Sequence, residues 1–214
     1  MSKIYIYVVD RDFGFAPNPF HGCCTLATCK PKIRNTARVN DWVIGMGGRR
    51  LKATGRCVFA MRVTEVITFN EYWSKPEYFD KKPVVNGSRK MMVGDNIYHK
   101  TSDNIWHQAL SHHSSKDGGT DFSNLSKDTS SEKVLISRRF CYFGKDAPVI
   151  SQSLLNSVGY KNQIGHRTFD KKTAAAIFGW LNDTILESFT QVIADPFDFS
   201  NSEKRYSESD NKIY

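Results

Sequence analysis

The sequence contains no uninterrupted run of about 18 apolar residues, the minimum that a membrane-spanning helix needs. Its first residues, from Met1 to Tyr5, include neither the apolar core nor the cleavage site of a signal peptide. These two absences predict a cytoplasmic protein that does not span a membrane.

Cofactor and metal motifs are also absent. The stretch from Gly45 to Gly48 has neither the spacing of a dinucleotide fingerprint nor the Lys-Ser/Thr pair of a P-loop. The five cysteines are odd in number and two are adjacent, which favours reduced thiols over a disulfide framework. No Cys-x-x-Cys pair supports a zinc site around His21, Cys23, Cys24 and Cys29. We therefore expect no bound cofactor and no metal, and leave a diffusible co-substrate open.

Positive charge is abundant and unevenly distributed. The chain has 30 Lys or Arg against 22 Asp or Glu, a formal net charge of +8, and residues 1–56 alone hold ten against three. A basic segment with aromatic residues suits a polyanion, because phosphates bind Lys and Arg while bases stack on rings. A basic, solvated surface with no partner explains the same charge equally well.

The residue pattern predicts an α+β fold of short elements. β-branched and aromatic residues predict strands over 3–9, 23–26, 42–46, 57–69, 134–136 and 139–143. A short helix is expected over 31–37, where Pro31 is tolerated in the first turn, and a helical turn is expected to start at residues 71–73 and to end before Pro76. The apolar stripe after Asp170 predicts a long C-terminal helix to about Ile193, packed on the core.

The chain has no internal repeat and no second apolar region, so we expect one domain over residues 1–195 with one core. Residues 111–132 are rich in Ser, Asp, Gly and Lys and predict an exposed, partly mobile loop in which His112 and His113 are solvated. Residues 196–214 are polar and are expected to form a disordered tail.

The segment from Asp10 to Arg34 gathers polar and reactive side chains on a backbone stiffened by prolines. Stiff loops hold such groups in fixed directions, with little entropy left to lose on binding. Lys30 and Arg34 are four residues apart across the predicted short helix and would share a face, where they could meet one phosphate. A structural loop whose polar groups satisfy its own backbone is the alternative. The candidates in this segment are Asn18, His21, Cys24, Thr25, Cys29, Lys30 and Arg34.

Nucleophilic chemistry is a second interpretation of the same segment. Cationic neighbours favour the thiolate, so Cys24 or Cys29 beside His21 could act as a nucleophile. Buried, inert thiols are the commoner outcome for such residues.

Two later clusters are also candidates. Asp95, Asn96, Tyr98 and His99 together could recognise a base edge, bind a sugar hydroxyl or transfer protons, although residues 94–96 also suit a plain turn. The stretch 165–167, which ends in Arg167, precedes the predicted long helix and suits an anion, or simply a helix-entry loop. Trp42 and Trp73 could stack on bases, but a Trp within an apolar strand is more often part of a core.

Several of these blocks resemble a known family. The stretches 12–20, 24–27, 29–31, 33–34 and 41–45, from Asp12-Phe13-Gly14-Phe15 through Asp41-Trp42-Val43-Ile44-Gly45, are similar to the second class of nucleotide-modification-associated domain. The stretches 72–73, 94–99 and 165–167 resemble its later blocks, so the likeness spans about residues 3–167. The resemblance implies a bacterial or phage system that modifies DNA bases, but it implies no defined reaction and no catalytic residues.

The order of predicted elements has a second likeness. An opening strand, a short basic helix, the stretch 40–43 entering a strand and then a long alternating strand look like a PUA-like barrel, including the group that flips modified bases into an aromatic pocket. Asn40 stands where that group usually has Gly, and the proline-rich insertion at 13–22 is longer than expected. The expected fold is thus a compact mixed β-barrel or strongly bent sheet, with the long helix packed on it.

Two functions follow from these patterns. A binding module for a nucleic acid, nucleotide or modified base would use Lys30, Arg34 and Arg167 for phosphate, and Trp42 or Tyr98 for stacking. In the same module, Asn18, Asp95 and Asn96 would form hydrogen bonds with the polar edges of the ligand. An enzyme acting on a base or nucleotide would use His21 or His99 as acid and base, with Asp95 as partner and Cys24 as a further nucleophile.

Overall fold

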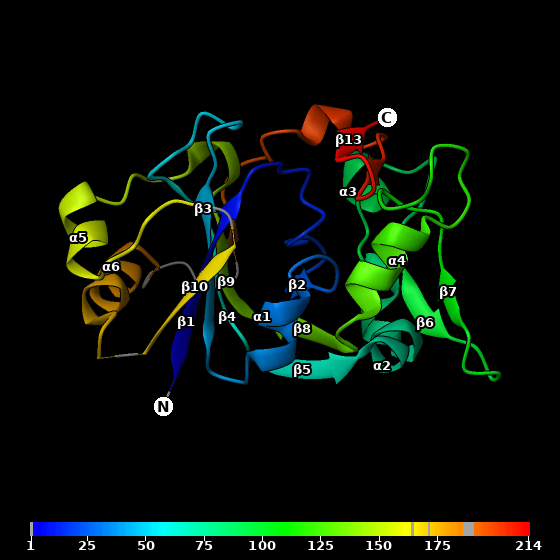
Figure 1. Ribbon diagram of the computed structural model, residues 1–214, viewed down its shortest axis with the longest axis horizontal. Helices are drawn as coiled ribbons and strands as arrows, with labels where there is room; N and C mark the ends of the chain where they lie inside the picture. The colour runs from blue at the N-terminus through cyan, green and yellow to red at the C-terminus, as the bar shows by residue number, and fades with distance from the viewer. Residues whose placement is uncertain (1, 164, 171, 186–190) are drawn as a thin grey trace.

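A computed structural model describes residues 2–163, 165–170, 172–185 and 191–214, and its largest element is a six-stranded mixed sheet (Figure 1). β1 pairs in parallel with β3, and β9 with β11, while the other neighbours are antiparallel. In spatial order the strands are β10 (His166–Asp170), β1 (Lys3–Val9), β3 (Trp42–Gly47), β4 (Cys57–Arg62), β9 (Arg139–Tyr142) and β11 (Gln191–Val192).

A second, three-stranded sheet continues from the first. It contains β2 (Cys24–Leu26), β8 (Lys133–Ser137) and β5 (Glu65–Thr68). The antiparallel pair β4–β9 ends with Arg62 opposite Arg139, and the pair β5–β8 begins with Glu65 opposite Ile136. The strand expected over 57–69 is therefore interrupted at residues 63–64, where the chain passes from one sheet to the other. Among the described residues neither sheet closes on itself, so the expected barrel is not formed.

Short helices flank the sheets. Figure 1 shows α5 (Gln152–Ser157) and α6 (Ala175–Ile185) on one side of the six-stranded sheet, and α1 (Pro31–Thr36) with the three-stranded sheet on the other. The remaining helices are α2 (Phe69–Ser74), α3 (Arg89–Met92) and α4 (Phe122–Thr129), with the 3-10 turns η1 (Pro76–Lys81), η2 (Gly144–Asp146) and η3 (Phe199–Asn201). Two hairpins, β6 (Tyr98–Lys100) with β7 (Trp106–Gln108) and β12 (Tyr206–Ser207) with β13 (Lys212–Ile213), complete the described elements.

The expected long C-terminal helix is wrong in its extent. Ile177 and Leu181 of α6 are buried in the core, as the apolar stripe predicts, but α6 has only 11 residues. Residues 191–192, which the prediction placed in the helix, pair with β9 as strand β11. The remainder of the predicted helix includes residues 171 and 186–190, which lie outside the described residues. No described helix has the length and apolar composition needed to cross a membrane.

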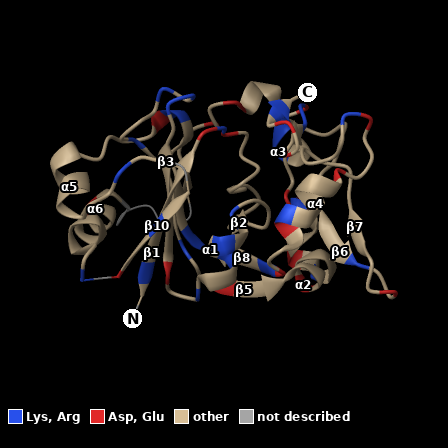
Figure 2. Ribbon diagram, viewed as in Figure 1, with Lys and Arg blue, Asp and Glu red and all other residues tan. Residues whose placement is uncertain are grey.

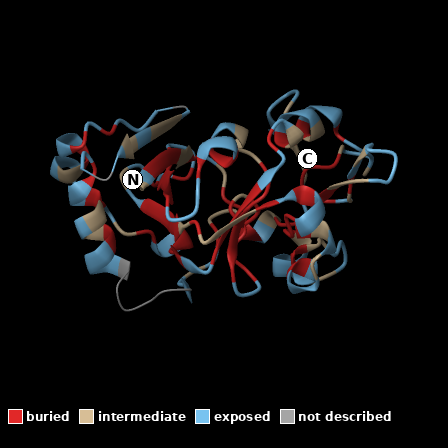
Figure 3. Cartoon of the chain, turned by 90° about the horizontal axis from the view of Figure 1, so that it is seen from below, coloured by how far each residue is buried: buried red, intermediate tan, exposed pale blue. Residues whose placement is uncertain are grey.

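Buried side chains form two clusters rather than the one expected core. One cluster surrounds the six-stranded sheet, and the other lies between the three-stranded sheet, α2, β6 and the proline-rich loop. Figure 3 shows the buried residues along the central strands and the exposed residues on the outer helices and loops.

Two segments that looked disordered in the sequence are folded. Residues 122–129 form α4, with the Asp121 side chain accepting from the Asn124 amide at its first turn, 2.9 Å away. His112 and His113, expected in solvent, are only 5% and 3% exposed. Residues 196–214, expected to be a disordered tail, include β12 and β13 and pack against α4. There the Asn124 side chain donates to the Tyr206 carbonyl at 2.7 Å.

Candidate functional site

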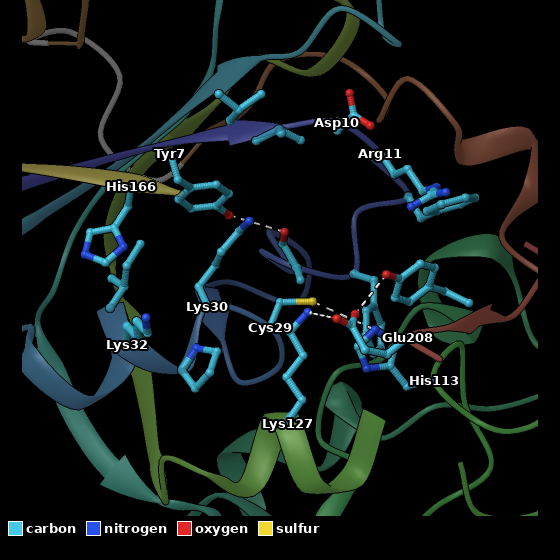
Figure 4. A pocket seen from close by; sticks show the side chains of 18 of the residues that line it. Tyr7, Asp10, Arg11, Cys29, Lys30, Lys32, His113, Lys127, His166 and Glu208 are labelled. Carbon is cyan, nitrogen blue, oxygen red and sulfur yellow. Dashed lines mark hydrogen bonds and ion pairs between the residues drawn. The ribbon is translucent and has the colours of Figure 1, made fainter. Parts of the chain in front are cut away.

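A pocket of about 390 Å³ opens between β1 and β10 on one side and α1, α4 and β12 on the other (Figure 4). Its volume falls in the range of small-molecule sites, about 300–1,000 Å³. The pocket is lined by aromatic rings, cations, two carboxylates, three imidazoles and one thiol. The residues that carry this chemistry are Tyr7, Phe13, Phe15 and Tyr206; Arg11, Lys30, Lys32 and Lys127; Asp10 and Glu208; His112, His113 and His166; and Cys29.

One end of the pocket is positively charged. Lys30 and Lys32 come from the start of α1, and His166 comes from β10, where it pairs with Tyr7 of β1. The Lys30 ammonium lies 4.6 Å from the centre of the Tyr7 ring. Within the described part of the chain, no carboxylate forms a salt bridge with Lys30 or Lys32. Burial and the charges of these two lysines lower the pKa of His166, which therefore stays neutral at pH 7.

The cations at the other end already have partners. Lys127 of α4 forms a 2.5 Å salt bridge with Glu208, and Arg11 donates to the Asn211 side chain at 2.8 Å while it covers the Tyr206 ring. Figure 2 shows basic residues on α1 and α4, the helices that flank the pocket. The positive charge available to a ligand is therefore concentrated at Lys30 and Lys32.

The thiol in the wall belongs to a Cys–His–Asp arrangement. The Cys29 Sγ lies 3.9 Å from the Nε2 of His113, and the Nδ1 of His113 lies 2.8 Å from Oδ2 of Asp128. The other oxygen of Asp128 accepts the Cys29 backbone N–H at 2.7 Å. Figure 4 shows Cys29 and His113 pointing toward each other across the pocket floor.

Asp128 is held as a carboxylate. It is fully buried and also accepts from the Tyr98 hydroxyl at 3.0 Å. Burial raises its pKa, but the charge and hydrogen bond of His113 and the charge of Arg34 outweigh burial and lower that pKa overall. Burial likewise lowers the pKa of His113, and the charges of Asp128 and Cys29 outweigh it and raise that pKa to about 10. The arrangement therefore favours an imidazolium at neutral pH.

Of the two cations predicted to share a phosphate, only Lys30 lines the pocket. Arg34 is fully buried and donates to four backbone carbonyls: Cys29 at 2.8 Å, Ser131 at 2.9 Å, Lys133 at 2.7 Å and Asp128. With these donors engaged, Arg34 joins α1 to the segment 128–133 and has no access to a ligand in the pocket.

Three predicted polar residues form a closed network elsewhere. Thr25 donates to Asp95 at 2.7 Å, and Asn18 accepts from the ammonium of buried Lys81 at 2.8 Å. The Lys81 ammonium also reaches the Thr25 hydroxyl at 3.3 Å. This network, with Tyr72 as a second donor to Asp95, stabilises the second hydrophobic cluster and does not line the pocket.

The other predicted binding residues lie apart from the pocket. Asn96 is buried and donates to the Tyr72 carbonyl at 2.8 Å, and Trp42 is packed in the main core at 8% exposure. Tyr98 is buried and donates to Asp128 from behind the pocket wall. Arg167 follows the pocket residue His166 on β10 but is not among the residues that line the pocket.

The residues proposed for catalysis are not brought together. Cys24 is fully buried with its sulfur 3.8 Å from that of Met61, and burial raises the pKa of its thiol far above the ordinary value. His21 is exposed, and His99 stacks on Trp73 with ring centres 4.1 Å apart. Since Asp95 is engaged in the buried network, it does not pair with His99.

Sequence reasoning missed Lys32, His113, Asp128 and the pocket residues of the C-terminal hairpin. Lys32 lies between two recognised candidates, and its position in a short basic helix is the one local signal for it. His113 and Asp128 lie in a segment whose polar composition is typical of a loop, and they meet Cys29 only through tertiary contacts.

A family model of nucleotide modification associated domain 2 matches residues 1–203. The chain belongs to this family. The match confirms the resemblance found in the sequence and associates the protein with nucleotide modification systems. Neither a curated protein nor a solved structure matches the chain. Most of the pocket of this nucleotide modification associated domain thus lies within the matched residues, while Tyr206 and Glu208 follow them.

Proposed function

We propose that the chain binds a nucleotide, or a similar phosphate-bearing derivative of a base, in the pocket between β1, α1 and α4. The observation that carries the proposal is the pair of lysines, Lys30 and Lys32, which lie at the end of an aromatic pocket and form no salt bridge with a described carboxylate. Membership of the nucleotide modification associated family supports a ligand of this class.

The electrostatics favour an anion at this end. Burial lowers the pKa of Lys30 and the charge of Lys127 adds to this effect, while the charges of Cys29, Glu208 and Asp10 oppose it. A phosphate between Lys30 and Lys32 would stabilise both ammonium groups, and hydrogen bonds to charged groups contribute about 1.5–3 kcal/mol each. His166, neutral at pH 7, has a ring nitrogen that would donate to or accept from the same ligand.

The rest of the pocket suits a base and sugar. Phe13, Phe15 and Tyr206 provide apolar and aromatic surface, and Tyr206 is fixed by the cation–π contact with Arg11 at 5.0 Å. Aromatic faces stack on bases with little sequence preference. The pocket volume favours one nucleotide unit over a long stretch of polymer.

The test is isothermal titration calorimetry with deoxynucleoside monophosphates, deoxynucleoside triphosphates and a short single-stranded DNA. We expect at least one of these ligands to bind, with affinity that falls as salt is raised. Lys30→Gln combined with Lys32→Gln should weaken that binding at least about tenfold, since about 1.4 kcal/mol corresponds to a factor of ten. Lys52→Gln, which removes an exposed lysine outside the pocket, is the matched control and should bind as the wild type does.

Other results would oppose the proposal. Equal loss of affinity in the Lys52→Gln control would show that the effect is one of overall charge. Absence of binding to every ligand at low salt would remove the pocket as a nucleotide site.

A further inference from the structure

The pocket holds the one cysteine whose surroundings differ from those of the other thiols. Cys23, Cys24, Cys57 and Cys141 are buried and do not line the pocket, and burial raises the pKa of each of these thiols. Cys29 is half-buried and lines the pocket. A ligand in the pocket would therefore meet the sulfur of Cys29 and of no other described cysteine.

The backbone at Cys29 presents its side chain in an uncommon conformation. Cys29 has a φ of 56°, in the left-handed region, which is sparsely populated by residues other than glycine. Surrounding contacts must hold such a conformation, and such positions are concentrated at functional sites. Two of these contacts are known: the Cys29 N–H donates to Asp128, and the Cys29 carbonyl accepts from Arg34.

His113 is oriented by Asp128 so that its free nitrogen faces the thiol. The Nδ1 of His113 donates to the Asp128 carboxylate, which leaves Nε2 directed at the Cys29 sulfur. This is the order of nucleophile, base and orienting acid that activates a weak nucleophile. The 3.9 Å separation is longer than an ideal hydrogen bond, and such contacts are often looser before a substrate binds.

We propose that Cys29, His113 and Asp128 form a catalytic triad that transfers or hydrolyses an acyl group, with Cys29 as nucleophile, His113 as acid and base, and Asp128 as the residue that positions His113. The substrate class is an ester or amide carried on a phosphate-bearing nucleotide or base derivative. That the substrate carries a phosphate rests on the proposed function, whereas the proposed reactivity of Cys29 does not rest on it.

The reaction balances with water or an amine as the only co-reactant. The Cys29 thiolate attacks the carbonyl carbon, and the carbonyl electron pair moves to oxygen. Collapse of this adduct breaks the C–O or C–N bond while the His113 imidazolium protonates the leaving atom, so that a thioester forms on Cys29. Water or an amine then attacks the thioester, His113 takes its proton, and cleavage of the C–S bond returns the thiolate. No group is oxidised or reduced.

The position of the lysines fits this substrate class. Lys30 follows Cys29 directly, and both residues line the same pocket (Figure 4). An anion at Lys30 and Lys32 would thus place an adjoining ester or amide near the sulfur, and such positioning supplies a large part of enzymatic rate enhancement.

The first test is alkylation of the folded full chain by iodoacetamide, followed by peptide mass mapping of all five cysteines. We expect Cys29 to react at least about tenfold faster than the others near neutral pH, where an ordinary thiol is mostly protonated. His113→Gln should slow Cys29 at least about tenfold near neutral pH, while the two rates should converge at alkaline pH, where thiolate forms without the imidazolium. A local folding defect would change the rate at both pH values.

Several neighbouring groups can influence how the alkylation rate of Cys29 depends on pH. Besides His113 and Asp128, the groups that interact electrostatically with Cys29 are Lys30, Arg34 of α1, Tyr98 of β6, Tyr7 of β1 and Tyr206 of β12, and Lys127 of α4 lines the same pocket. His99→Gln is the matched control, because His99 is also a partly buried imidazole but stacks on Trp73 and does not line the pocket. It should leave the alkylation profile unchanged, whereas Asp128→Asn should move the rise in rate to higher pH.

The second test detects the acyl group on Cys29 directly. With p-nitrophenyl acetate we expect a burst of about one equivalent of nitrophenolate and an acetyl group on Cys29, both absent in Cys29→Ala. The triad is refuted if Cys29 reacts no faster than the buried thiols, if His113→Gln and His99→Gln have the same profile, or if no acetyl group reaches Cys29. If Cys29 behaves as expected but no nucleotide binds, the proposed function fails and the triad stands. The reverse result leaves a binding pocket without catalysis.

Discussion

The buried carboxyl of Asp12 makes the free energy of unfolding depend on pH. Its carboxylate is buried, accepts from the Tyr142 hydroxyl, and accepts the Phe197 N–H at 3.1 Å, so it fastens the C-terminal segment to the main sheet. Burial raises the pKa of Asp12 from 3.8 to about 6, and the hydrogen bonds from Tyr142, Phe197 and Gly14 oppose burial only in part.

The sign of the pH dependence follows from this direction. Because the folded protein favours the protonated carboxyl more than the unfolded chain does, the stability contributed by Asp12 is complete below pH 3.8 and is lost as pH rises through about 6. The interval between these two values, at about 1.4 kcal/mol for each pKa unit, corresponds to about 3 kcal/mol. Asp12→Asn mimics the protonated carboxyl and should not show this loss.

The assay is urea unfolding of both proteins from about pH 3 to pH 8, monitored by tryptophan fluorescence. Relative to the wild type, Asp12→Asn should gain about 3 kcal/mol in unfolding free energy between the two ends of this range. Since the other titrating groups are common to both proteins, the difference isolates Asp12. Tyr142→Phe removes a donor to the carboxylate and should steepen the pH dependence. A constant difference between wild type and Asp12→Asn at every pH would refute the reasoning.

Two further changes test the site and its frame. Arg34→Lys should lower the unfolding free energy by about 3 kcal/mol in a urea titration, because an ammonium cannot serve the four carbonyls that the guanidinium contacts; a loss below about 1 kcal/mol would show that these contacts contribute little. Glu208→Gln should raise affinity for deoxynucleoside monophosphates several-fold in calorimetry, since it releases Lys127 from its salt bridge, with less than about 1 kcal/mol change in stability. Unchanged affinity would show that Lys127 does not reach the ligand.

The elements that sequence reasoning located are those with local signals. β-branched and aromatic residues specify β1 and the first half of β3, and Pro31 specifies the first turn of α1. The break at residues 63–64 has no such signal, because residues on both sides have strand character. Only pairing with β9 and then β8 decides where the chain changes sheets.

The site was harder to predict because its parts are distant in the sequence. His113 is 84 residues from Cys29, and Asp128 is 15 residues beyond His113. Composition alone makes residues 111–132 a loop, and no spacing rule connects them to the N-terminal segment. Asn18 and Thr25 were expected in a binding site, but both accept from the ammonium of buried Lys81 in a closed network. The sequence around Lys81 contains no pattern that indicates this structural role.

The arrangement around Arg34 bears on how mutational surveys of this protein are interpreted. A scan that neutralises every Lys and Arg in the basic N-terminal quarter would find Arg34 among the most damaging positions. Its loss would resemble that of a phosphate ligand, although the guanidinium holds the carbonyls of Cys29 and Asp128 together from behind. A measurement of folded fraction beside each binding measurement separates the two kinds of position, with loss at Lys32 expected in the folded protein and loss at Arg34 in a protein that has partly unfolded.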